Sequence, residues 1–232
     1  MALEIEAKPQ VSSSQIFERI RREGHVARRP ITRGRLVIQH DTYLDTCGGQ
    51  LYYSGASLRV REKDGQYILT MKTSVEATHV RVEDEAFLTE DEAADVLGGR
   101  LSDVDCDIAR AAIAYAGTAD LRPVLLASNQ RETWTVASTQ GSLKMCFDWV
   151  HYSDAADESA SAVAEDYELE VELQRGPRSL VNEAALYLSR RYGLSPQLCS
   201  KYERGVSLIG AFGCETFAPA AEPSLEPALA AV

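Results

Sequence analysis

The sequence predicts an α+β protein in which an antiparallel sheet or barrel carries helices on its outside. Three observations support this fold class. About eight strand-like runs follow one another along the chain, and few of them are separated by a long helix. Each run alternates apolar with charged residues, as a strand with one packed and one ionic face does. Helix-like segments with polar caps and glycine ends lie before, between and after the strands.

The first half of the chain begins with a predicted helix over residues 12–24, where serines provide the cap and a glycine ends the helix. An arginine-rich stretch over residues 28–35 is expected to be a loop. The dipeptide Asp64-Gly65 predicts a tight hairpin between two strands. In this half, strands are expected over residues 35–46, 56–62, 66–73 and 79–88.

In the second half, the alanines and aliphatic residues recur at intervals of three and four within the predicted helices. A Gln140-Gly141 turn is expected to join two of the strands, and the acidic stretch over residues 153–165 is expected to be a loop. Helices are expected over residues 90–97, 105–115, 179–193 and 201–209, and strands over residues 127–138, 141–152 and 165–174. Residues 213–232, rich in Ala, Pro and Glu, predict a disordered tail, which leaves residues 1–212 as one domain.

Chain length, apolar content and cysteine spacing exclude several classes of protein. A chain of 232 residues, 45% of them apolar, is long enough for one well-packed domain, and no apolar run approaches the ~20 residues that span a bilayer. Its start shows no signal-peptide pattern, and its five cysteines never stand as CxxC. We therefore expect a cytoplasmic protein with no membrane partner, no disulfide framework and no structural zinc.

The charge of the chain is strongly acidic, with a formal net charge of −11. This average field argues against nucleic acid as a partner, because phosphate backbones attract surfaces rich in Lys and Arg. A small concave site can nevertheless be locally basic within an acidic protein. The distribution of charge over the predicted strands is consistent with such a site.

Strand after strand has one apolar and one ionic face. Between residues 143 and 149 the odd positions are Leu, Met, Phe and Trp, and the even positions are Lys, Cys and Asp. The ionic faces collect seven cations and eight anions: Lys8, Arg59, Arg61, Lys72, Arg81, Arg131 and Lys144, with Glu4, Glu6, Glu83, Glu85, Asp148, Glu168, Glu170 and Glu172.

Two interpretations of these ionic faces remain open. The simpler one is a half-exposed antiparallel sheet whose polar side faces water. The other follows from the row Glu168, Glu170 and Glu172, whose like charges repel across roughly 6 to 7 Å. If the sheet curls so that this row faces Glu4 and Glu6, the carboxylates can hold Mg²⁺ or Mn²⁺. The cations would then face a metal-bound phosphate chain.

A set of ordered motifs resembles the CYTH family, also called triphosphate tunnel metalloenzymes. The opening Glu4-x-Glu6-x-Lys8 is similar to the ExExK signature of that family. Six further blocks follow in the order and approximate spacing of the family: "DTYLDT", "LRVRE", "LTMKT", "RVEDE", "ELEVEL" and "SKYERG". The resemblance covers about residues 2 to 210 and implies a closed eight-stranded antiparallel barrel that binds a triphosphate and a divalent metal in its tunnel.

The resemblance also implies roles for individual residues. The expected metal ligands are Glu4, Glu6, Asp148, Glu168, Glu170 and Glu172. The expected phosphate-binding residues are Lys8, Arg59, Arg61, Lys72, Arg81, Arg131, Lys144 and Lys201, the last on a helix that plugs the tunnel. The expected catalytic set is Glu4, Glu6, Lys8, Glu170 and Glu172.

The function expected from these residues is hydrolysis of a small triphosphate, first of all inorganic triphosphate, with Mg²⁺ or Mn²⁺ as cofactor. Such a reaction needs positioning and charge neutralisation rather than a nucleophilic side chain. The alternatives are a class IV adenylate cyclase, a thiamine triphosphatase, a polyphosphate- or nucleotide-binding module without activity, and a structural β-domain. Asp45 is expected to fix a loop by hydrogen bonding and Tyr43 to pack in the barrel.

Overall fold

The structure, a computed structural model of the chain, describes residues 2–3, 5–74, 81–156 and 164–212. Its strands are β1 (Ala2–Leu3), β2 (Glu6–Ala7), β3 (Gln10–Val11), β4 (His25–Val26), β5 (Arg29–Asp45), β6 (Ala56–Lys63), β7 (Gln66–Ser74), β8 (Arg81–Leu88), β9 (Arg122–Ser138), β10 (Gly141–Asp154) and β11 (Ala164–Arg175). Its helices are α1 (Gln15–Glu23), α2 (Gln50–Tyr53), α3 (Glu90–Leu97), α4 (Asp107–Ala116), α5 (Ser179–Tyr192) and α6 (Lys201–Ile209).

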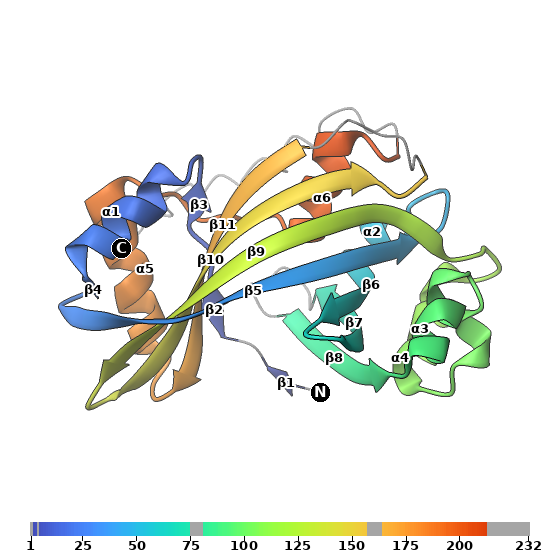
Figure 1. Cartoon of the computed structure of the whole chain (residues 1–232), viewed down its shortest axis with the longest axis horizontal. Coiled ribbons are helices and arrows are strands. Elements are labelled where there is room, and N and C mark those ends of the chain that lie inside the picture. Colours follow the sequence, from blue (N-terminus) through green and yellow to red (C-terminus); the bar gives the residue numbers. More distant parts are fainter. Residues whose placement is uncertain (1, 4, 75–80, 157–163, 213–232) are drawn as a thin grey trace, which may run out of the picture.

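One antiparallel sheet organises the molecule, in the order β1-β8-β7-β6-β5-β9-β10-β11-β2 (Figure 1). The predicted hairpin at Asp64-Gly65 is confirmed, because Lys63 pairs with Gln66 and both turn residues have positive φ angles, 52° and 74°. The helices predicted from periodicity are also confirmed; α2 is an addition that the sequence pattern did not indicate.

The prediction of a loop over the arginine-rich residues 28–35 is wrong, because β5 begins at Arg29 and includes the rest of this stretch. Its residues pair on both sides, with β4 at Arg29 and with β9 at Ile31, which lies opposite Val136. The ladder shifts register between Arg33 and Leu36, where a β-carbon on Gly34 would lie 2.6 Å from Thr133 Oγ1. Cross-strand pairing outweighs the low strand propensity of a charged run in this stretch.

The sheet is a curled half-barrel that is open among the described residues, so the prediction of a closed barrel is not confirmed. The N-terminal segment passes from one edge of the sheet to the other. Its strand β1 pairs with β8, and after two intervening residues its strand β2 pairs with β11. Among the described residues no strand pair joins β8 directly to β11. Because each N-terminal strand has only two residues, neither edge gains a full ladder of hydrogen bonds.

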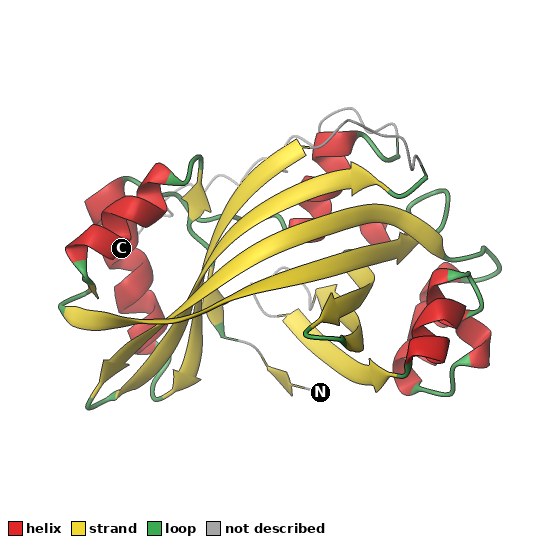
Figure 2. Ribbon diagram, viewed as in Figure 1, coloured by secondary structure: helices red, strands yellow, loops and turns green. Residues whose placement is uncertain are grey.

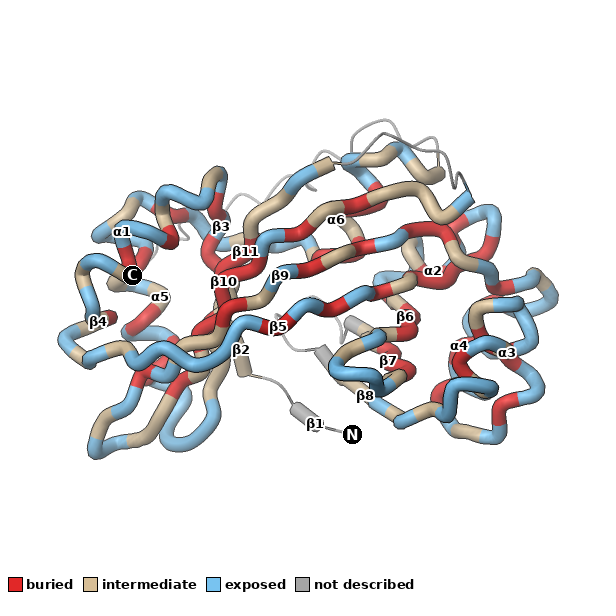
Figure 3. Tube along the Cα trace, in the orientation of Figure 1, coloured by how far each residue is buried: buried red, intermediate tan, exposed pale blue. Residues whose placement is uncertain are grey.

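Helices cover the convex face at the two ends of the sheet (Figure 2), as the prediction of helices on the outside requires. At one end α1 and α5 pack on the apolar side of β10, with Leu143, Met145 and Phe147 in the shared core. At the other end α3 and α4 pack on Leu58 and Leu69 of β6 and β7. Figure 3 shows the resulting alternation of buried and exposed residues along the central strands.

Helix α6 instead packs against the concave side of the sheet. Tyr202, the second residue of α6, stacks on Tyr43 of β5 with ring centroids 4.9 Å apart. Lys201 places its ammonium 2.8 Å from Asp148 on the ionic side of β10. Among the described helices, none combines the length and apolar character that crossing a bilayer requires.

The expectations for several segments lie outside the described residues. These are Glu4, residues 79–80 of the predicted strand over 79–88, residues 157–163 of the predicted acidic loop, and the tail over residues 213–232. The side chain of Arg81 is also outside the described part of the structure.

Candidate functional site

The concave face of the sheet holds a cavity of about 400 Å³ with a strongly charged lining. Eight cations and four carboxylates line it: Lys8, Arg59, Arg61, Lys63, Lys72, Arg131, Lys144 and Lys201, with Glu83, Glu85, Glu170 and Glu172. This surplus of positive charge stands within a protein of net charge −11. A concave, basic lining focuses positive potential on whatever enters it, which favours a polyanion.

Strand alternation puts these cations in one row. On β6, Arg59, Arg61 and Lys63 follow one another at two-residue intervals and face the cavity, while Leu58 and Val60 between them pack into the core under α3 and α4. The sequence pattern had identified the first two of these cations. It missed Lys63, although continuing the same alternation by one more step would have found it.

A buried acid anchors the arginine of β9. Asp148 has no exposed surface, and it accepts hydrogen bonds from Arg131 at 2.8 and 2.5 Å and from Lys201 Nζ at 2.8 Å. Burial alone would lower the pKa of Arg131, but the charges of Asp148 and Glu170 outweigh it and raise that pKa well above its ordinary value. Arg131 and Lys201 therefore stay charged at the cavity wall.

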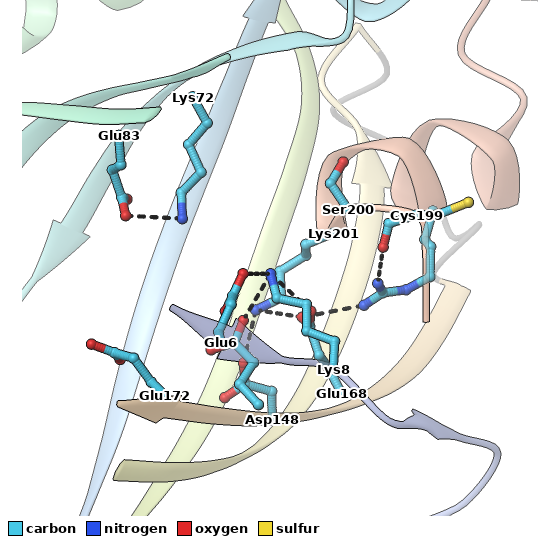
Figure 4. Close-up of polar contacts among 12 residues, drawn as sticks. Glu6, Lys8, Lys72, Glu83, Asp148, Glu168, Glu172, Cys199, Ser200 and Lys201 are labelled. Carbon is cyan, nitrogen blue, oxygen red and sulfur yellow. Dashed lines mark hydrogen bonds and ion pairs between the residues drawn. The ribbon is translucent and has the colours of Figure 1, made fainter. Parts of the chain in front are cut away.

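Glu168 is the second buried acid and lies beneath the lining. Its Oε2 lies 3.0 Å from Lys201 Nζ and 3.2 Å from Arg204 Nη2 (Figure 4). These contacts are ion pairs, since neither oxygen of Glu168 accepts a well-formed hydrogen bond. Burial would raise its pKa, but the neighbouring cations Lys201 and Arg204 lower it below its ordinary value. Glu168 is thus an ionised carboxylate that several cations balance beneath the lining.

The acidic cluster has the donor set that a hard divalent cation requires. Asp148, Glu168 and Glu170 each offer an oxygen, and these oxygens lie within 4.8 Å of one another. Glu6 of β2 lies opposite Glu172 of β11 in the strand register, next to this cluster along β11. Carboxylate oxygens such as these fit Mg²⁺ or Mn²⁺ in chemical type.

Lys8 connects the acidic cluster to the cavity. Its ammonium lies 2.9 Å from Glu6, 3.6 Å from Glu170 and 3.8 Å from Glu168. Burial would lower the pKa of Lys8, but the three carboxylates outweigh it and raise that pKa above its ordinary value. Lys8 is thus a fixed cation that balances several acids at once.

On the opposite wall, β5 supplies an acid that the sequence pattern did not single out. Asp41 is buried, and it accepts hydrogen bonds from Arg61 Nε at 2.6 Å and from Arg61 Nη2 at 2.7 Å. Arg59 Nη1 lies 3.4 Å from the same carboxylate. Burial would raise the pKa of Asp41, but both arginines lower it. Asp41 therefore orients two cations toward the cavity; its alternation with Tyr43 within "DTYLDT" was the available signal.

The position of Lys201 depends on the loop that leads into α6. Ser200 and Glu203 form a capping box that begins the helix at Lys201.

Asp45, at the end of β5, holds the backbone of α2 and the side chain of Tyr202 in α6. It accepts hydrogen bonds from Leu51 N and Tyr52 N at 2.9 and 2.8 Å and from Tyr202 OH at 2.8 Å. The interpretation of Asp45 as a loop-fixing residue is confirmed.

The predicted site residues fall into three groups. The cavity lining includes Lys8, Arg59, Arg61, Lys72, Arg131, Lys144, Lys201, Glu170 and Glu172. Outside the lining but in contact with these residues are Glu6, Asp148 and Glu168. Glu4 and the side chain of Arg81 lie outside the described residues.

A larger hollow of about 570 Å³ lies on the convex face beside α1. Aromatic residues such as Trp134 and Trp149 line it, and its two arginines, Arg21 and Arg33, both pair with Glu132. Its charges are balanced. The concave cavity is therefore the better candidate site for a polyanion.

The whole described sheet is similar to known proteins. The family model for the CYTH domain matches residues 2–205. A search of curated proteins returned no match. Among solved structures, a candidate adenylate cyclase from Bacillus halodurans is 23% identical, with a TM-score of 0.57 over 88% of this chain and 98% of that chain. A candidate adenylyl cyclase from Hippeastrum, described as having a dominant triphosphatase activity, is 19% identical, with a TM-score of 0.61 over 90% and 97%.

Proposed function

The chain belongs to the CYTH domain family, and on that premise we propose that it is a metal-dependent hydrolase of a small triphosphate, inorganic triphosphate first. One observation carries the proposal. The cavity lining has eight cations and only four carboxylates, and a cluster of three acids that suits a divalent metal lies at its edge. A triphosphate chain with a bound metal is the ligand that uses both parts of such a site.

In this proposal the cations hold the non-bridging oxygens of the phosphates. Arg59 and Arg61, held from behind by Asp41, present fixed guanidinium groups from one wall. Arg131 and Lys201, held by Asp148, do the same from the other. Because acids fix these groups before the substrate arrives, they stabilise charge that develops during cleavage with little reorganisation.

The carboxylates are proposed to hold the metal and the water. Glu170, with Asp148 and Glu168 beside it, is proposed to hold the metal, and Glu6 and Glu172 extend this set along β2 and β11. Glu4 is proposed as a further ligand from its place in the Glu4-x-Glu6-x-Lys8 motif. A divalent metal bound there neutralises phosphate charge and lowers the pKa of an attacking water. Lys8, between Glu6 and Glu170, is proposed to exchange a carboxylate contact for a phosphate oxygen.

The test is phosphate release from inorganic triphosphate, ATP and thiamine triphosphate with Mg²⁺ or Mn²⁺. We expect release that requires the metal and is fastest for inorganic triphosphate. Glu6→Gln is expected to lower this activity by about 100-fold or more, since it removes a metal ligand, while the melting temperature stays near that of the wild type. Glu62→Gln, on the exposed outer side of β6, is the matched control and keeps full activity. No release from any substrate would defeat the proposal.

Adenylate cyclase is the second candidate, because both solved structures described above are candidate cyclases. Product analysis with ATP separates the reactions, since cyclase activity gives cyclic AMP and pyrophosphate. Tight binding of triphosphate without any turnover would instead support a binding module.

A further inference from the structure

The cavity has a closed end and an open end. Helix α6 closes one end, where Tyr202 is 2% exposed and the side chain of Lys201 is 8% exposed. At the other end the side chain of Lys144 is 37% exposed. A group attached to the end of a triphosphate, such as a nucleoside or thiamine, is too large for the closed end and must lie at the open end.

The open end is formed by the β6–β7 turn lying against β5 and β9. Arg35 connects them: its side chain donates a hydrogen bond to Asp64 at 2.8 Å, and its backbone N–H donates to Thr133 Oγ1 at 3.2 Å. Lys63 precedes Asp64, and Lys63 and Thr133 both line the cavity. Lys63 therefore lies at this rim, at the end of β6.

The described cavity lining has no aromatic ring at this rim; the exposed Phe87, opposite Ile68 in the β7–β8 register, lies outside the lining. The aromatic residues in the cavity lining are Tyr43 and Tyr202, which belong to the closed end. They are buried and stacked on one another at an interplanar angle of 17°. Nucleobases are commonly held by stacking on such rings. Within the described lining, the rim offers cations, Thr133 and Ile68 instead.

Lys63 differs from the other cations of the lining. Each of the other seven has a carboxylate within 4.0 Å: Glu6 for Lys8, Asp41 for Arg59 and Arg61, Glu83 for Lys72, Asp148 for Arg131 and Lys201, and Glu172 for Lys144. For Lys63 no such ion pair exists among the described residues. Burial and the charges of Arg35 and Arg61 lower its pKa, while the charge of Asp64, which is itself paired with Arg35, raises it. The ammonium of Lys63 thus lies near cations and has no carboxylate of its own in ion-pair contact among the described residues.

We propose that Lys63 is the specificity-determining residue that selects inorganic triphosphate over triphosphates with an organic end group. A terminal phosphate at the rim supplies the anion that Lys63 lacks. An unesterified terminal phosphate carries up to two negative charges, whereas a phosphate that bears an organic group carries only one. A nucleoside adds no charge and thiamine adds a positive one, so both substrates compensate the ammonium less. This inference rests on the proposed triphosphatase function, and it assigns the preference to one side chain.

The experiment compares kcat/KM for inorganic triphosphate and for ATP, with the same Mg²⁺ concentration, in Lys63→Ala, Lys63→Arg and the wild type. Lys63→Ala is expected to reduce the preference for inorganic triphosphate by about 10- to 100-fold, the usual effect of losing a charge-assisted contact. Activity with ATP should be nearly unchanged. Lys63→Arg should retain most of the preference, and Glu62→Gln, the next residue along β6 but on its outer side, should retain all of it.

Equal losses with both substrates would overturn the inference, since Lys63 would then be a general phosphate ligand or a structural residue. An unchanged preference in Lys63→Ala would overturn it as well, as would a wild-type preference for ATP. Calorimetric affinities for both ligands in the same variants give a second measure of the preference. If the wild type hydrolyses neither substrate, the proposed function fails, and the affinity ratio still tests Lys63.

Discussion

Asp148 shows at the scale of a residue how the site depends on buried charge. Its carboxylate is entirely buried and joins Arg131 of β9 to Lys201 of α6. Taking these charges out of water is costly, and it is offset only while each charge keeps its partners. The same contacts hold the two cations at the cavity wall, so stability and ligand binding depend on one side chain.

Asp148→Asn is expected to destabilise the protein by about 3 kcal/mol or more, because it leaves buried cations short of negative charge. The control is Glu172→Gln, whose side chain is 22% exposed and pairs with the more exposed Lys144, and whose expected cost is below about 1 kcal/mol. Urea denaturation with unchanged m-values measures both costs. Equal costs for the two variants would contradict this account of Asp148.

Contacts between α1 and α5 show how two elements far apart in sequence are joined on the convex side. Glu23, at the end of α1, accepts hydrogen bonds from Tyr187 OH at 2.5 Å and from Tyr192 OH at 2.6 Å. Arg191 Nε lies 3.1 Å from the same carboxylate. The hydrogen bonds from Tyr187 and Tyr192 lower the pKa of Glu23 to about 2.

A lowered pKa in the folded state makes this contact depend on pH. Its stabilisation is present above the ordinary pKa of 4.5 and is lost as the pH falls toward 2, because the unfolded chain binds a proton first. In Glu23→Gln, the free energy of unfolding should therefore fall less between pH 5 and pH 2 than in the wild type. Denaturant titrations across this range measure it, and identical pH profiles would contradict the role of Glu23.

At the scale of the whole molecule, an acidic protein keeps a basic hollow inside an open half-barrel. The two walls of the hollow come from β6 and β7 on one side and from β9, β10 and β11 on the other. The N-terminal segment touches both edges, through β1 and β2. A ligand that contacts both walls would therefore hold together parts of the sheet that have few direct contacts.

Inorganic triphosphate with Mg²⁺ is expected to raise the melting temperature by about 5 °C or more when its concentration is 100 times the Kd. The rise should shrink at high salt, because surface charges are screened. Differential scanning fluorimetry measures both effects, and in Glu6→Gln the part that requires Mg²⁺ should be lost. A melting temperature that does not respond to metal or triphosphate would support a structural β-domain instead.

Local patterns were sufficient to predict much of the architecture and the site. Period-two alternation placed Arg59 and Glu170 on the ionic side and Leu58 and Phe147 on the apolar side, and all four lie there. The pattern failed for residues 28–35, where pairing with β4 and β9 makes a strand of a charged run. It also missed Asp41, whose alternation with Tyr43 marks one side of the strand but does not show which arginines the acid will meet.

The order of residues is enough to predict which side of each strand is ionic, because side-chain direction in a strand is a local property of the backbone. Tertiary structure alone shows the open sheet, the burial of Asp148 and Glu168 beneath the cavity, and, among the described residues, the lack of an ion pair for Lys63. These features depend on register, curvature and the packing of α6, which bring together residues from distant parts of the chain.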